Sequence, residues 1–193
     1  MIVACLGDSI TAGSPLWDPE AAVRERIGAA LDERSQWEYW AERAHADLRF
    51  RNCGVYGERT DEIAARLERC ADGAEALVVQ GGINDIAQHR STAKAGEALL
   101  GMVRRGKGLG LRVALADVLP WNRGWPDRAW SIDDLNARIA EIALAEQVPL
   151  LPFHDTLVDQ GQPGRMRTEW TDDLDHPSVE GYRRLGEYAF RLP

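Results

Sequence analysis

The chain has 193 residues and a net charge of −8. That length suits one domain over residues 1–193, and the negative charge argues against non-specific binding to nucleic acid or to anionic membranes. No stretch approaches the roughly 20 apolar residues of a membrane span, so we expect no stable membrane insertion.

Five short apolar runs are predicted to be strands, because each is rich in β-forming residues and most end at glycine or proline. Continuous apolar runs of this kind are typical of strands that are buried on both faces of a sheet. The runs are Ile2–Leu6, Leu48–Cys53, Ala76–Gln80, Leu111–Val118 and Val148–Phe153.

Longer stretches between these runs carry apolar residues at three- and four-residue spacing, which predicts helices. Thr60 is expected to cap the second helix and Ser178 to begin the last one. The helical patterns cover residues 37–48, 60–67, 93–105, 132–145 and 178–188.

This alternation of strands and helices predicts an α/β fold, a five-stranded parallel sheet with helices on both faces. Such sheets bind ligands at the carboxyl ends of their strands. The segment Ser14–Glu33 interrupts the alternation and is interpreted as an insertion with a helix at Ala21–Leu31, lying over the Ser9 side of the sheet.

The cysteines Cys5, Cys53 and Cys70 are odd in number and lack framework spacing, which argues against a disulfide scaffold. Cys5 and Cys53 lie in predicted strands and are expected to be buried thiols, whereas Cys70 follows a helical pattern and is expected to be partly exposed. The apolar start Met1–Leu6 is too short for a signal-peptide core. Free thiols and the lack of a targeting segment together predict a cytoplasmic protein.

Gly7-Asp8-Ser9-Ile10 follows the first predicted strand. Gly7 permits a sharp turn, which would point Ser9 into the crevice above the sheet as a nucleophile. The alternative is that Ser9 only caps the following helix, as serine often does.

Asp173-Leu174-Asp175-His176-Pro177 could supply a base and the group that orients it. A nucleophilic serine needs both, and Asp173 can reach the His176 ring if the segment turns once. The alternatives are an acidic surface loop that happens to contain a histidine, and a cation site, although no calcium-loop spacing accompanies the aspartates.

Two further strand ends carry candidate oxyanion donors. Asn84 follows Gly81-Gly82 after the third strand and could offer its side-chain amide, while Gly57 follows the second strand and offers a backbone N–H. Each has a structural alternative: Asn84 as a turn residue and Gly57 as an ordinary strand-to-helix connection. Asp8 and Asp85 are expected to support these loops.

The four segments resemble those of the SGNH (GDSL-type) hydrolase family from residue 2 to about 190. Gly7-Asp8-Ser9 resembles block I, Asn52–Thr60 block II with one extra residue before Thr60, Gly82-Ile83-Asn84-Asp85 block III, and Asp173-x-x-His176-Pro177 block V. The resemblance implies a flavodoxin-like α/β/α sandwich. It also implies ester hydrolysis through an acyl-serine, with Ser9, His176 and Asp173 as the triad and the Ser9 N–H, Gly57 N–H and Asn84 as oxyanion donors.

The chain departs from the family pattern at two places. Leu174 stands where the family often has glycine, and Tyr56 stands where small residues are frequent, followed by Glu58-Arg59 before Thr60. Neither change removes a candidate catalytic group, but both could reshape the pocket.

The substrate is predicted to be a small-molecule ester, with short acyl groups favoured because Tyr56, Trp121 and Trp125 could crowd the crevice. The tryptophans could equally be lid packing.

A carbohydrate acetylesterase, a lysophospholipase-like or thioesterase-like hydrolase and an acyltransferase remain alternatives. No metal or cofactor is expected, because the histidines His45, His89, His154 and His176 lack partners at ligand spacing. The oligomeric state is left open.

Overall fold

The computed structural model describes residues 1–192. Its sheet has five strands, paired throughout in parallel, in the order β2-β1-β3-β4-β5. The α/β sandwich predicted from the sequence is therefore confirmed. The strands are β1 (Ile2–Gly7), β2 (Arg49–Gly54), β3 (Ala76–Val79), β4 (Arg112–Ala116) and β5 (Leu150–Leu151).

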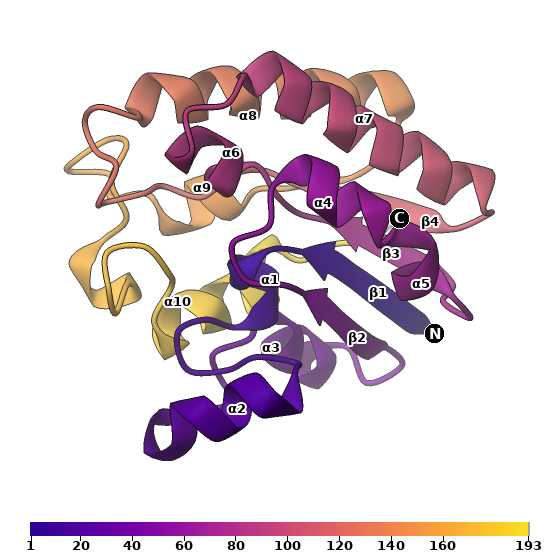
Figure 1. Cartoon of the computed structure of the whole chain (residues 1–193), viewed down its shortest axis with the longest axis horizontal. Helices are drawn as coiled ribbons and strands as arrows, with labels where there is room; N and C mark the ends of the chain where they lie inside the picture. Colours follow the sequence, from indigo (N-terminus) through magenta and orange to yellow (C-terminus); the bar gives the residue numbers. More distant parts are fainter. Residues whose placement is uncertain (193) are drawn as a thin grey trace.

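Helices cover both faces of this sheet (Figure 1). Alternate residues of β1 enter opposite cores: Ala4 and Leu6 pack with one set of helices, and Val3 and Cys5 with the other. The first face carries α4 (Thr60–Ala65), α5 (Leu67–Ala71), α6 (Ile83–Ala87), α7 (Thr92–Gly108) and α8 (Ala129–Glu146). The second carries α3 (Trp37–Ala44), α9 (Phe153–Leu157), α10 (Val179–Arg184) and the π-helical segment η3 (Leu185–Ala189).

Most helix starts agree with the sequence, with one correction. Ser178 is the N-cap of α10, and its hydroxyl accepts a hydrogen bond from the Gly181 N–H. Thr60, however, is the first residue of α4 rather than its cap, which is Arg59. The Thr60 hydroxyl donates instead to the Asp85 carboxylate at 3.1 Å. Asp85, which is distant in the sequence, therefore binds the Thr60 hydroxyl that the local pattern predicted to cap the helix.

The insertion forms the predicted helix as α2 (Ala21–Ile27), followed by a 3₁₀ turn, η1 (Gly28–Ala30). None of the α2 side chains is buried, and the helix lies outside the second helical layer, beyond α1 (Ser9–Ala12) (Figure 1). No helix within residues 1–192 combines the length and the apolar character that a bilayer crossing requires.

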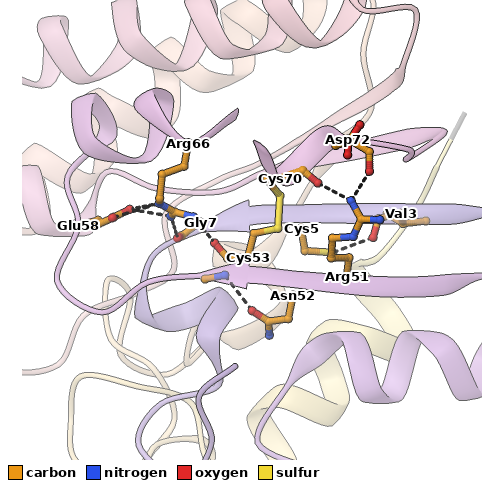
Figure 2. Close-up of a disulfide and its surroundings, with 11 residues drawn as sticks. Val3, Cys5, Gly7, Arg51, Asn52, Cys53, Glu58, Arg66, Cys70 and Asp72 are labelled. Carbon is orange, nitrogen blue, oxygen red and sulfur yellow. Dashed lines mark hydrogen bonds and ion pairs between the residues drawn. A yellow bond between two sulfur atoms is a disulfide. The ribbon is translucent and has the colours of Figure 1, made fainter. Parts of the chain in front are cut away.

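The prediction of free thiols was wrong for two of the three cysteines. Cys53 at the end of β2 and Cys70 in α5 form a disulfide (Figure 2), with their Cα atoms 6.0 Å apart. Cys70 is also buried, not partly exposed, and Cys5 is a buried free thiol. The sequence separation of 17 residues matches no framework spacing, so only the packing of α5 against the sheet edge reveals the pair. The bridge removes the free-thiol argument for a cytoplasmic location.

Candidate active site

Ser9 lies at the carboxyl end of β1, where the chain turns into α1. The Asp8 side chain is the cap of this helix and accepts the Ile10 N–H at 2.9 Å. The alternative in which Ser9 caps the helix is therefore wrong, and the Ser9 hydroxyl is available for another partner. Its Oγ lies 3.0 Å from Nε2 of His176.

His176 is held on its other side by Asp173, whose Oδ2 lies 2.8 Å from Nδ1 of the ring. Asp173 Oδ1 also accepts the backbone N–H groups of Asp175 at 2.9 Å and of His176 at 2.7 Å. Partial burial raises the pKa of Asp173, but the His176 bond and charge and the two N–H groups outweigh it and lower the pKa to about 2. An ionised Asp173 favours the tautomer with the proton on Nδ1, which leaves Nε2 free to accept from Ser9.

The loop that carries this pair has a strained residue at its tip. Leu174 has φ +70°, a conformation that side chains other than glycine rarely adopt. Arg123 holds the loop in this shape, because its N–H donates to the Leu174 carbonyl at 3.1 Å and its Nη2 to the Asp173 carbonyl at 2.9 Å.

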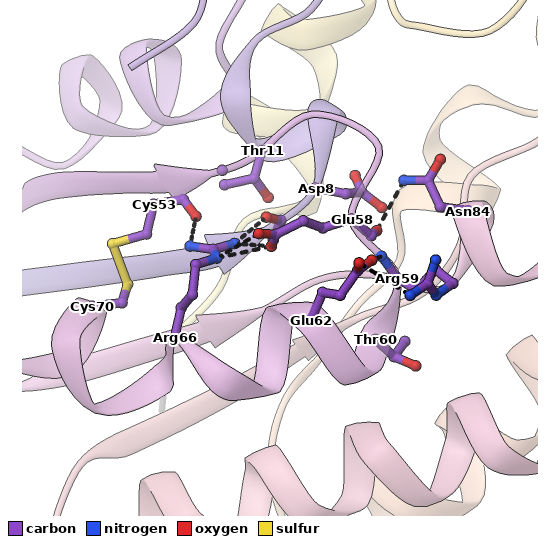
Figure 3. Close-up of polar contacts among 12 residues, drawn as sticks. Asp8, Thr11, Cys53, Glu58, Arg59, Thr60, Glu62, Arg66, Cys70 and Asn84 are labelled. Atoms are coloured by element: carbon purple, nitrogen blue, oxygen red, sulfur yellow. Dashed lines mark hydrogen bonds and ion pairs between the residues drawn. A yellow bond between two sulfur atoms is a disulfide. The ribbon is translucent and has the colours of Figure 1, made fainter. Parts of the chain in front are cut away.

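Asn84, at the start of α6, lies close to the loop that carries Gly57. Asn84 is in the first turn of α6, and its Nδ2 donates to the backbone carbonyl of Glu58 at 3.0 Å (Figure 3). Gly57, directly before Glu58, is exposed and has φ +73°. Within residues 1–192, neither the Gly57 N–H nor the Ser9 N–H has a hydrogen-bond acceptor. Two free N–H groups and the second hydrogen of the Asn84 amide are thus available as donors.

Asp85 and Asp8 make hydrogen bonds within the segments that carry the candidate site residues. Asp85 accepts the Thr60 N–H at 2.9 Å and the Thr60 hydroxyl, and so ties the start of α6 to the start of α4. Asp8 is buried, which raises its pKa to about 6. The role of both residues as loop supports remains a prediction.

Comparison with known proteins decides the family. Residues 5–184 match the model of the GDSL-like lipase/acylhydrolase family. The chain belongs to this family. Family membership implies hydrolase activity, and a serine nucleophile within a catalytic triad is typical of its members.

Solved structures show the same fold at low sequence identity. A protein assigned to the G-D-S-L lipolytic family from Desulfitobacterium hafniense is 19% identical, with a TM-score of 0.79 over 97% of both chains. A G-D-S-L family member from Veillonella parvula is 20% identical, with a TM-score of 0.76 over 98% of this chain and 95% of that one. The lipase/acylhydrolase from Enterococcus faecalis is 22% identical, with a TM-score of 0.74 over 96% and 91%. Comparison with curated proteins gives no significant match.

The tryptophans suggested as pocket residues have other contacts in this GDSL family member. Trp121 packs against the hydrophobic core on the face of the sheet that carries α4 to α8. Its Nε1 donates to Asp175 at 2.7 Å, so it contacts the loop that carries His176. Trp125 is 42% exposed, and the Arg165 guanidinium lies 5.5 Å from the centre of its ring. These contacts favour the lid-packing alternative for both residues.

Tyr56 lies beside the triad, with its ring centre 6.1 Å from that of His176. Its hydroxyl is hydrogen-bonded to Ser14. Tyr56 also lines a cavity of about 390 Å³ between the insertion and the end of β2, together with Asp18, Val23, Arg66 and the disulfide. The aromatic ring thus stands at the border between His176 and this cavity.

Sequence reasoning missed two polar groups near the site. Gln80 Oε1 accepts the Asp8 N–H at 3.2 Å and the Thr11 hydroxyl at 2.8 Å beneath the Ser9 turn. Arg66 binds the block II loop from below (Figure 3). Gln80 closes a predicted strand and Arg66 lies in a helical pattern, so neither residue carried a local signal.

Among residues 1–192, no group of three or more histidine, cysteine or acidic side chains is arranged to hold a metal ion.

Proposed function

We propose that this family member is a serine esterase in which Ser9 is the nucleophile, His176 the base and Asp173 the orienting carboxylate. The observation that carries the proposal is the continuous chain of contacts from Ser9 Oγ to His176 Nε2 at 3.0 Å and from His176 Nδ1 to Asp173 at 2.8 Å. This is the geometry that acyl transfer by a hydroxyl nucleophile requires.

In the first half-reaction, Ser9 Oγ forms a bond to the ester carbonyl carbon while its proton moves to His176 Nε2. The carbonyl oxygen becomes an oxyanion, and the Ser9 N–H, Gly57 N–H and Asn84 amide donate to it. His176 then gives its proton to the leaving alkoxide as the carbon–oxygen bond of the ester breaks.

In the second half-reaction, water attacks the acyl-Ser9 carbonyl while His176 removes its proton. The same donors hold the second oxyanion. Collapse of this intermediate releases the carboxylic acid and returns the proton to Ser9. Asp173 remains ionised throughout, because its pKa of about 2 lies far below neutral pH.

Short acyl esters, acetyl to butyryl, are the proposed substrates. Tyr56 supports this choice, because its ring lies beside His176 and its hydroxyl is tethered to Ser14. Each buried methylene gains roughly 0.8 kcal/mol only while there is room for it, and clashes afterwards.

The test is kcat/KM across p-nitrophenyl esters from acetate to decanoate, with acetylated sugars alongside and Ser9→Ala as the blank. We expect activity to be highest from acetate to butyrate and to be lost in Ser9→Ala. Tyr56→Ala should move the optimum to longer chains. A steady rise to decanoate in the unmodified protein would contradict the short-chain proposal and favour a lipase-like or thioesterase-like role.

A further inference from the structure

Arg66, between α4 and α5, reaches beneath the loop that carries Gly57. Its side chain is only 15% exposed, and its partner Glu58 is 18% exposed. The guanidinium donates from Nε to Oε1 of the Glu58 carboxylate at 3.1 Å and from Nη2 to Oε2 at 2.6 Å (Figure 3). This two-bond arrangement is the strong, directional pairing that arginine forms and lysine cannot.

The same guanidinium also binds two backbone carbonyls at the ends of neighbouring strands. Nη1 donates to the Cys53 carbonyl at 2.8 Å in β2, and Nη2 donates to the Gly7 carbonyl at 3.1 Å in β1 (Figure 2). One side chain therefore joins both strand ends to the loop that follows β2.

Each proposed oxyanion donor is either within two residues of a residue that Arg66 binds or hydrogen-bonded to one. Gly7 precedes Ser9 by two residues, and Glu58 directly follows Gly57. The Glu58 carbonyl accepts the Asn84 amide at 3.0 Å, so the third donor is attached to the same residue. Arg66 itself contacts no donor atom, and any influence on the reaction must pass through these backbone positions.

We propose that Arg66, paired with Glu58, is a positioning residue that sets the spacing of the Ser9 N–H, the Gly57 N–H and the Asn84 amide. The inference rests on the proposed serine esterase function. Oxyanion donors accelerate a reaction only if they are in place before charge develops, and a misplacement of about 1 Å can cost roughly 10²-fold in rate. Loss of Arg66 leaves the Cys53 and Gly7 carbonyls without this donor and frees the Glu58 side chain.

The disulfide makes this role separable from folding. Cys53, whose carbonyl Arg66 binds, is also linked covalently to Cys70 in α5. The end of β2 therefore keeps a second attachment when the guanidinium is removed. A positioning role predicts a lower kcat in a folded variant, whereas a purely structural role predicts a lower stability with normal kcat per folded molecule.

The experiment measures kcat and KM of Arg66→Met, Arg66→Lys and Glu58→Gln on p-nitrophenyl acetate. The control is Arg105→Met, which removes an exposed guanidinium that pairs with Glu68 between α5 and α7. We expect kcat to fall roughly 10- to 100-fold in Arg66→Met with KM changed less than threefold, a smaller fall in the other two variants, and no change in the control. The shape of the pH–rate profile should be unchanged, because His176 and Asp173 are untouched.

A double-mutant cycle with Asn84→Ala supplies a second measurement. If Arg66 acts through the oxyanion donors, the effect of Arg66→Met on kcat must shrink when Asn84 is already absent. A normal kcat in folded Arg66→Met, or full additivity with Asn84→Ala, would overturn the inference. If Arg66→Met does not fold, the same double-mutant cycle between Glu58→Gln and Asn84→Ala tests the inference. Activity that persists in Ser9→Ala would instead defeat the proposed function itself.

Discussion

The side-chain amide of Asn84 donates to the backbone carbonyl of Glu58 at 3.0 Å. This bond fixes a residue that follows β3 to the loop that follows β2, and it orients the second amide hydrogen, which no carbonyl of the same loop uses. The sequence admits two roles for Asn84, oxyanion donor or turn residue, and kinetics distinguishes the two.

Asn84→Ala should lower kcat roughly 10²- to 10³-fold with little change in KM, because a bond to the oxyanion strengthens only in the transition state. Asn136→Ala is the matched control: Asn136 also donates its amide to a backbone carbonyl, that of Val118 at 2.8 Å. The control should lose stability but keep kcat per folded molecule. Equal kcat values for Asn84→Ala and the unmodified protein would make Asn84 a turn residue only.

Asp173→Asn should lower kcat by roughly 10⁴-fold, because a neutral amide no longer holds His176 in the tautomer that accepts the Ser9 proton. The loop should survive, since the amide oxygen can still accept the N–H groups of Asp175 and His176. Asp175→Asn is the control on the same loop, where Asp175 binds Trp121 and Arg123. Steady-state kinetics on p-nitrophenyl acetate measures both. Equal losses in the two variants would indicate that loop integrity, not the Asp173 charge, matters.

Glu38 in α3 should make the fold less stable as pH rises. Its carboxylate is buried without a hydrogen-bond partner among residues 1–192, and burial raises its pKa well above the ordinary value of about 4.3. Above that ordinary pKa the unfolded chain releases the proton while the folded chain keeps it, so the free energy of unfolding falls with rising pH.

Glu38→Gln should therefore raise Tm at pH 8 and make little difference at pH 4, relative to the unmodified protein. Glu33→Gln, at an exposed site nearby, should change neither value. Thermal unfolding followed by circular dichroism measures both. A Tm difference that does not depend on pH would show that Glu38 does not titrate in this way.

The disulfide between Cys53 and Cys70 should contribute about 3 kcal/mol to the free energy of unfolding, as expected for a closed loop of this order of length. Urea unfolding with and without dithiothreitol measures it, and a Cys53→Ala/Cys70→Ala variant should not respond to the reductant. Thiol titration of the denatured, unreduced protein should find Cys5 alone. Reaction of all three cysteines would contradict the bridge.

Local patterns were sufficient to predict the number of strands and to propose the candidate site, but not every strand boundary. The fifth strand was predicted over Val148–Phe153 and is only Leu150–Leu151, because the chain turns at Pro152 into α9. The carboxyl ends of parallel strands meet at one edge, so Ser9 and Asn84 could be placed together without coordinates. Asp173 and His176 could be paired because three residues of a turning chain bring the carboxylate to the ring. These inferences need only spacing and element type.

The misses all depend on contacts between distant segments. Thr60 has an ordinary capping sequence, but Asp85 from the next loop takes its hydroxyl. Trp121 lies in an aromatic loop suited to substrate, yet Asp175 accepts its N–H. The sequence does not distinguish Arg66 from a surface arginine of a helix. In the structure, the ends of β1 and β2 place two carbonyls beside it. Such partners are set by packing, which a single sequence does not specify.

The most direct test of the proposed mechanism is the site of covalent labelling by a fluorophosphonate. The reagent forms a stable phosphonyl ester with a serine hydroxyl that is activated by a neighbouring base. After incubation, proteolysis and mass spectrometry should locate the label on the peptide containing Ser9, and His176→Ala should abolish it. Labelling at another serine, or hydrolysis of p-nitrophenyl acetate that continues in Ser9→Ala at the original rate, would contradict the assignment of Ser9 as the nucleophile.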